Sequence, residues 1–71
     1  MKAIYDPETD TLSIILRNEP IVESDEIREG LILDYAKDGK MVSIEVLDAS
    51  EQLSEPQSFT YEIKEAHRQA A

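Results

Sequence analysis

The chain lacks the residues on which several kinds of chemistry depend. It contains no cysteine, no tryptophan, a single histidine and only two glycines. Without cysteine it forms neither disulfides nor thiolate metal sites, and one histidine makes a zinc site built by one chain unexpected. The sequence also has no phosphate-binding glycine pattern and no nucleophile elbow. We therefore expect a protein that is not an enzyme and that needs no cofactor; catalysis would require acidic residues assembled from two chains.

Positive charge and long apolar runs are scarce as well. Seven lysines and arginines stand against 16 acidic residues, a formal net charge of −9. Such a surface is repelled by nucleic-acid backbones and by anionic membranes. The first residues contain no signal-peptide run and no segment reaches transmembrane length, so we expect a cytoplasmic protein. Charge complementarity favours a small basic protein as partner, and acidity that serves solubility alone is the alternative.

The length of 71 residues predicts one domain with a small core. A chain of this size buries only roughly 60% of its surface on folding. Small domains gain further stability from disulfides, metals or association. Since the first two routes are not expected here, we expect a homodimer or a complex with another protein.

Period-two alternation predicts about five strands joined by tight turns. They are expected at residues 3–5, 11–16, 21–27, 31–35 and 41–47. Residues 21–27, IVESDEI, are highly charged and suit a sheet edge, where charges discourage unwanted pairing. The pattern predicts an antiparallel β-meander.

The alternation ends at Leu47, where helix signals begin. Asp48 or Ser50 is a candidate N-cap, and Glu51 occupies the capping-box position relative to Asp48. We expect a short helical turn here, followed by a linker centred on Pro56.

The tail has two competing patterns. Phe59 and Ile63 are spaced as on a helix with Ser58 as N-cap, whereas Phe59, Tyr61 and Ile63 also alternate as in a strand. Helix-forming residues dominate the last eight positions, so we predict a C-terminal helix. The predicted fold is therefore α+β: a sheet domain over residues 1–55 and a C-terminal helix, or partner-docking tail, over residues 56–71.

The predicted sheet has apolar residues on both faces. One face, expected to be buried, carries Leu12, Ile14, Leu16, Leu33, Val42, Ile44 and Val46. The opposite face still offers Ile15, Ile32, Met41 and Leu47. A sheet with two apolar faces needs a cover on each, and the chain supplies at most one helix. The second-face residues and the tail residues Phe59, Tyr61 and Ile63 therefore form a candidate partner interface.

Residues 34–45, DYAKDGKMVSIE, share several positions with a calcium-binding loop. Asp34, Asp38, Gly39 and Glu45 match, but the third position is Ala36, which has no side-chain oxygen. The flanking segments alternate like strands, and Asp-Gly between such runs is typical of a hairpin. We predict a hairpin here; a weak divalent-cation site at this hairpin is the alternative.

Two segments resemble a family of small uncharacterised prokaryotic domains of unknown function. The opening YDPETDTLSIIL and the closing GLILDYAKDGKMVSIEVLDAS carry the similarity, which covers residue 3 to about residue 53. The chain departs from the family pattern at Ala36, where Asp is common, and at Ser43, where Gly is common.

The resemblance implies no activity and no catalytic residues. Some members of the family are encoded beside small toxin-like proteins, which implies an antitoxin role by association. An acidic, partner-seeking chain with a tail that folds onto a basic toxin suits that role. The expected function is a non-enzymatic protein-interaction domain resembling an antitoxin, with a homodimeric structural domain as the alternative.

Overall fold

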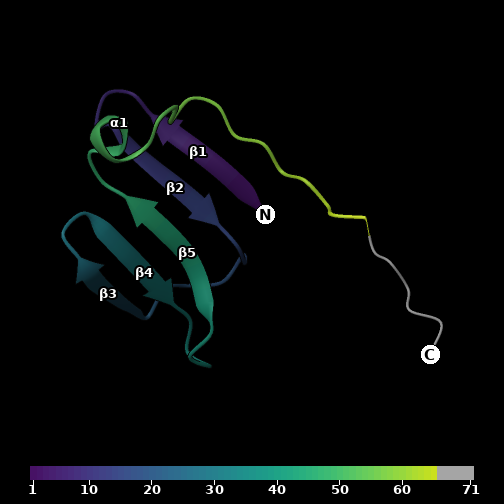
Figure 1. Ribbon diagram of the computed structural model, residues 1–71. Helices are drawn as coiled ribbons and strands as arrows, with labels where there is room; N and C mark the ends of the chain where they lie inside the picture. Colours follow the sequence, from purple (N-terminus) through teal and green to yellow (C-terminus); the bar gives the residue numbers. More distant parts are fainter. Residues whose placement is uncertain (66–71) are drawn as a thin grey trace.

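The computed structural model describes residues 1–65, which form one antiparallel sheet and one short helix (Figure 1). In chain order the elements are β1 (Lys2–Asp6), β2 (Thr11–Ile15), β3 (Glu23–Arg28), β4 (Leu31–Tyr35), β5 (Met41–Val46) and α1 (Ala49–Gln52). The five predicted strands are thus confirmed.

The strand order differs from the predicted meander. Across the sheet the order is β1-β2-β5-β4-β3, with every neighbouring pair antiparallel. Residues 16–22 therefore carry the chain from β2 past β5 and β4 to the far edge. The charged strand β3 is at an edge, as predicted, and all six of its residues are exposed. The more apolar β5 takes the centre, because a central strand has neighbours on both sides to pack its side chains.

The segment between β4 and β5 is the predicted hairpin. Gly39 has a positive φ of 85°, and its amide donates to the Ala36 carbonyl oxygen at 2.9 Å. The Ala36 amide in turn donates to the Lys40 carbonyl oxygen at 2.9 Å. Glycine adopts this left-handed conformation without steric cost, so the Asp-Gly pair closes the turn.

The predicted C-terminal helix is wrong, and so is the α+β class that depended on it. Residues 53–65 contain no helix, and the fold described is predominantly β. A helix this short needs a surface to pack against, and the aromatic and β-branched residues at 59–63 are weak helix formers. Ser58, the expected N-cap, instead donates its amide to the Glu55 carbonyl oxygen at 3.0 Å in a turn. The remainder of the predicted helix, residues 66–71, lies outside the described residues.

The predicted helical turn is confirmed as α1. Asp48 is its N-cap residue, but the Asp48 side chain makes no capping hydrogen bond. Its φ of 50° lies in the left-handed region, and this conformation turns the chain from β5 into α1. The helix is four residues long and buries only Ala49.

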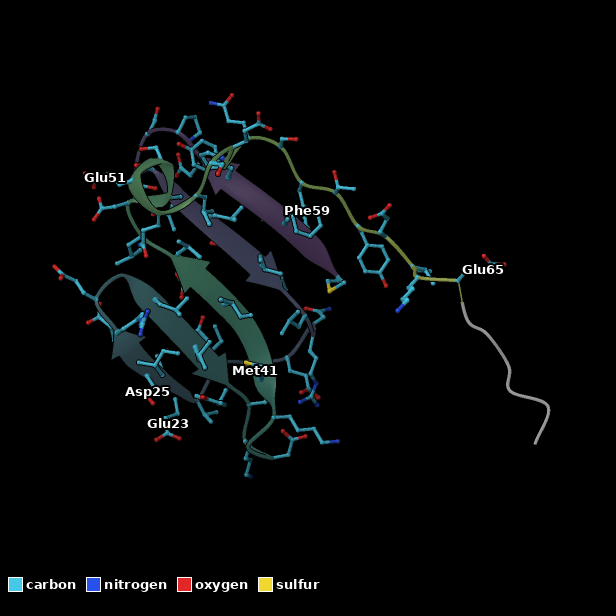
Figure 2. The ribbon with its side chains drawn as sticks, in the orientation of Figure 1. Glu23, Asp25, Met41, Glu51, Phe59 and Glu65 are labelled. Atoms are coloured by element: carbon cyan, nitrogen blue, oxygen red, sulfur yellow. The ribbon has the colours of Figure 1, made fainter. Side chains whose placement is uncertain are left out.

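The described chain has almost no core of large apolar side chains. Its buried hydrophobic residues are Leu12, Ala36, Val42 and Ala49. The largest side chain less than 2% exposed is a carboxylate, that of Asp34. Figure 2 shows why: side chains stand on a single sheet that no second layer covers in the described part of the chain.

Candidate interaction surface

The pairing register separates the sheet into two chemically distinct faces. On one face, two rows cross β2, β5 and β4: Leu12, Val46 and Leu31 form the first. Ile14, Ile44 and Leu33 form the second. We call these six residues the apolar face. Their shared side confirms the alternation read from the sequence.

The face that the sequence predicted to be buried is only partly buried. Of its seven predicted residues, Leu12 and Val42 are 8% and 3% exposed, but the other five are half-buried. The reason is the missing C-terminal helix: α1 has four residues, which is too short to cover a face that spans three strands. The uncovered surface therefore includes the face that was predicted to be the core.

The opposite face is more polar, although Ile4, Ile15 and Ile32 also lie on it. Across its strands it carries Ser13 beside Glu45, then Ile15 beside Ser43, and Asp34 between Ser43 and Ser24. We call it the polar face. Ser43, on this face, is only 5% exposed.

The structure does not gather the predicted second-face residues into one patch. Ile15 pairs with Ser43 and Ile32 with Glu45, so the two half-buried isoleucines are separated by polar residues of β5. Met41 is 38% exposed at the start of β5, and Leu47 is half-buried beyond its end. These four residues do not form a continuous apolar surface.

Asp34 organises the polar face. The hydroxyls of Ser24 and Ser43 donate to its two carboxylate oxygens, each at 2.6 Å, and Asp34 is 1% exposed. Burial alone raises the pKa of Asp34, but hydrogen bonds from Ser24, Ser43 and Glu45 outweigh it and hold that pKa below its usual value. Each oxygen of the buried charge thus has a partner from an adjacent strand.

The pKa of Glu45 shifts in the opposite direction from that of Asp34. Its hydrogen bond with Asp34 raises the pKa of Glu45, and burial and the negative charge of Asp34 add to this effect. A Glu45 carboxyl that keeps its proton donates to Asp34, whereas an ionised one is repelled by it. Sequence reasoning grouped Asp34 and Glu45 only as possible cation ligands and missed their hydrogen bond; the signal for it was their shared face across the hairpin.

The third carboxylate of the considered calcium loop has a different partner. Asp38, in the hairpin turn, accepts two hydrogen bonds from the Arg17 guanidinium, at 3.1 and 3.3 Å. Asp34 and Glu45 meet on the polar face instead. Among residues 1–65, no three His, Cys, Asp or Glu side chains are grouped so that they could hold a metal ion.

The opening and closing segments of the sequence meet at Asp10. Its carboxylate accepts hydrogen bonds from the Tyr5 hydroxyl at 2.7 Å, the Ser50 amide at 2.9 Å and the Ser50 hydroxyl at 2.6 Å. Its carbonyl oxygen accepts the amide of the fully buried Ala49 at 2.8 Å. The hydrogen bonds from Ser50 and Tyr5 lower the pKa of Asp10, and the bond with Asp10 raises that of Tyr5. The hydrogen bonds to Asp10 therefore connect α1 to the β1–β2 turn.

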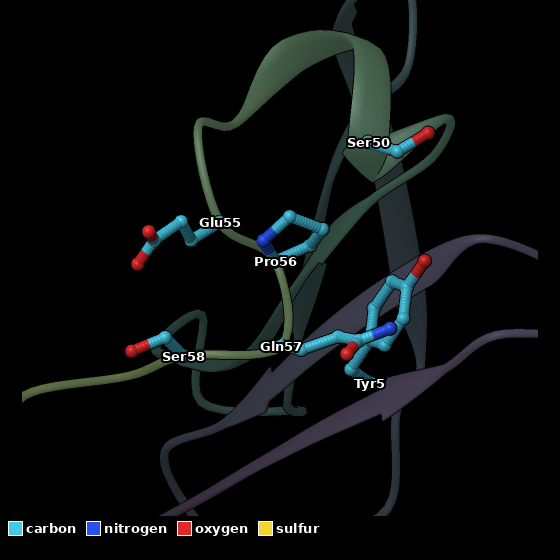
Figure 3. A pocket seen from close by; sticks show the side chains of 6 residues that line it. All are labelled: Tyr5, Ser50, Glu55, Pro56, Gln57 and Ser58. Atoms are coloured by element: carbon cyan, nitrogen blue, oxygen red, sulfur yellow. The ribbon is translucent and has the colours of Figure 1, made fainter.

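An open pocket of about 460 Å³ lies beside the hydrogen bonds that Asp10 accepts (Figure 3). Tyr5 and Ser50 line it together with residues 55–58. The Tyr5 hydroxyl and the Ser50 side chain are both engaged by Asp10. The pocket lies where the tail leaves the sheet, and two of its polar groups, those of Tyr5 and Ser50, already have partners within the chain.

The tail carries the most exposed part of the predicted interface. Phe59, Tyr61 and Ile63 are 55%, 67% and 82% exposed. The segment is extended and leads away from α1 on the β1 side of the sheet (Figure 1). Strand-like alternation, the alternative interpretation of its sequence, matches this backbone better than the predicted helix.

These features define a small, predominantly β domain built on a single antiparallel sheet. The family described as "Protein of unknown function (DUF2283)" matches residues 2–50, and the chain belongs to this family. No curated protein and no solved structure matches the chain. In residues 1–65 no helix is long and apolar enough to cross a membrane.

The matched residues include Asp10 with its partners Tyr5 and Ser50. They also include Asp34 with its partners Ser24 and Ser43. The segments that carry the family resemblance thus contact one another in the fold. Their roles in this structure are to join α1 to the sheet and to satisfy a buried carboxylate. The exposed tail begins after the matched residues end.

Proposed function

We propose that this chain is a non-enzymatic protein-interaction domain that binds a small basic protein through its extended tail, in the manner of an antitoxin. The observation that carries the proposal is the tail itself. Three large apolar side chains, those of Phe59, Tyr61 and Ile63, stand exposed at alternate positions of an extended segment.

An extended segment of this kind suits recognition by strand addition or by docking into a groove. Main-chain hydrogen bonds supply affinity in such complexes, and pockets for alternate side chains supply specificity. Ordering a segment on binding costs conformational entropy, which the burial of aromatic and aliphatic side chains offsets.

The charge of the chain supports a basic partner. The net charge is −9, and acidic residues extend into the tail as Glu55, Glu62 and Glu65. Glu23 and Asp25 add charge at the β3 edge, on the far side of the sheet from the tail (Figure 2). Complementary charge accelerates association and disfavours acidic partners.

The test is deletion of the tail. Removing residues 57–71 should abolish the complex with the basic protein, because the exposed apolar side chains are lost with it. The sheet should remain folded, since within residues 57–65 the one backbone hydrogen bond made to the rest of the chain is that from Ser58 to Glu55. Circular dichroism would report the sheet, and titration calorimetry with a small basic protein that copurifies with the chain from its own host would report binding.

A matched variant tests whether binding depends on the apolar side chains of the tail or only on its presence. Replacing Phe59, Tyr61 and Ile63 by serine keeps the tail and its charge, and it should weaken binding as strongly as the deletion. Replacing Thr60 by serine, on the other side of the extended segment, should leave affinity unchanged. Retained binding after the deletion would contradict the proposal.

A further inference from the structure

The fold as one chain presents it is a single layer. A sheet with an apolar side is stable only when that side packs against another layer. The chain provides α1, which has four residues and buries only Ala49. In the described residues, the apolar face lacks a second layer, and five of its six aliphatic side chains are half-buried.

The composition of the apolar face is that of an interface centre. On this side of β2, β4 and β5 the register places aliphatic residues at the middle of the sheet and no charged residue. Charges appear at the β3 border, where Arg28 pairs with Leu31, Asp25 with Leu33 and Glu23 with Tyr35. An apolar centre free of charge with a polar rim is typical of protein–protein contacts.

Three observations select a second copy of this chain as the occupant. The apolar face has no charge with which to attract the basic partner of the tail. The tail leaves the sheet on the β1 side instead of folding across this face (Figure 1). The acidic edge strand β3 repels its own copy, which disfavours pairing through that edge and favours face-to-face packing.

We propose that two copies pack their apolar faces together to form a two-layer β-sandwich about a twofold axis. Ile44, at the centre of β5 and flanked by Ile14 and Leu33, lies at the middle of that contact. Such packing is isologous, so one self-complementary surface suffices and the assembly closes at two chains. The polar faces then lie outward and both tails remain available for partners.

The first test is sedimentation equilibrium of the full chain alone, from low to high micromolar concentration. A monomer–dimer equilibrium or a stable dimer is expected, with a melting temperature that rises with protein concentration. A monomer at every concentration would overturn the inference. Because no basic protein is present, this result is independent of the tail-binding function.

A matched pair of variants locates the contact. Ser13 and Ile14 are neighbours on β2 that lie on opposite faces, so Ser13→Lys and Ile14→Lys place the same charge on either side of the sheet. Ile14→Lys should produce a folded monomer, whereas Ser13→Lys, beside Glu45, should remain a dimer. Dimers from both variants would show that the contact lies elsewhere and would overturn the proposed face.

A milder variant covers the outcome in which lysine at position 14 unfolds the chain. Ile14→Thr keeps a β-branched side chain and removes apolar area from both copies, so the dissociation constant should rise roughly tenfold or more. An unchanged dissociation constant would contradict the proposal. The tail-deleted chain should still dimerise, which separates this contact from partner binding.

Discussion

At the scale of single residues, the polar face shows how one buried carboxylate is kept charged. Asp34 accepts hydrogen bonds from serines of both neighbouring strands, and Glu45 completes the group from β5. The folded-state pKa of Asp34 is lowered, so its stabilisation is present above its ordinary value of 3.8 and is lost as the pH falls through the folded value. Glu45 has a raised pKa, so its contribution is complete below 4.5 and is lost as the pH rises through its folded value.

Glu45→Gln isolates this pH dependence. Glutamine donates a hydrogen bond to Asp34 without ionising, so the variant should gain stability relative to wild type as the pH rises from 4.5 towards 7. The expected gain in free energy of unfolding at neutral pH is about 1 kcal/mol, the usual size of one hydrogen bond. Urea unfolding across this range would measure it, with the exposed Glu62→Gln as control. A difference between Glu45→Gln and wild type that does not change with pH would show that the two carboxyls titrate independently.

At the scale of secondary structure elements, what could be predicted from the sequence depended on local signals. Alternation identified all five strands, and the Asp-Gly pair identified the β4–β5 hairpin through Gly39. The strand order could not be derived, because the insertion of β5 between β2 and β4 depends on contacts between distant residues. The tail was mistaken for a helix because its helix-forming composition was weighed without the packing surface that a short helix requires. The hydrogen bond between Asp34 and Glu45 was missed, although both were considered as cation ligands, because strand register and not sequence spacing brings the two carboxyls together.

The turns that contain Asp10 and Asp48 test how turn side chains stabilise the neighbouring secondary structure elements. Asp10 and Asp48 have nearly the same left-handed φ, 53° and 50°, but different roles. The carboxylate of Asp10 holds Tyr5 and Ser50, whereas that of Asp48 makes no capping hydrogen bond. Asp48→Gly should therefore relieve backbone strain and raise the free energy of unfolding by up to about 1 kcal/mol. Asp10→Gly relieves the same strain but releases α1, so its melting temperature should fall. Thermal unfolding of both variants would decide; equal shifts would mean that the Asp10 hydrogen bonds contribute nothing.

At the scale of the whole molecule, one small chain presents surfaces of two kinds. The apolar face carries no charge on its three central strands, and most of the acidity lies on the β3 edge, the turns and the tail. Self-association through the first surface brings two chains of net charge −9 together, whereas a basic partner on the tail is attracted by the same charge. The two proposed associations therefore respond to ionic strength in opposite directions.

Salt separates the two associations in one experiment. Raising the ionic strength shortens the range of electrostatic forces from about 8 Å at physiological salt to about 3 Å at 1 M. Repulsion between the two acidic chains weakens, so the dissociation constant of the homodimer should fall as salt is added. The dissociation constant of the complex with a basic partner should rise, mainly through slower association. Sedimentation of the chain alone, and calorimetry with the partner, at low and high sodium chloride would measure both. A homodimer that weakens as salt is added would be held by ion pairs, and the contact would then lie at the charged border near Arg28 and Asp25 and not at the apolar face.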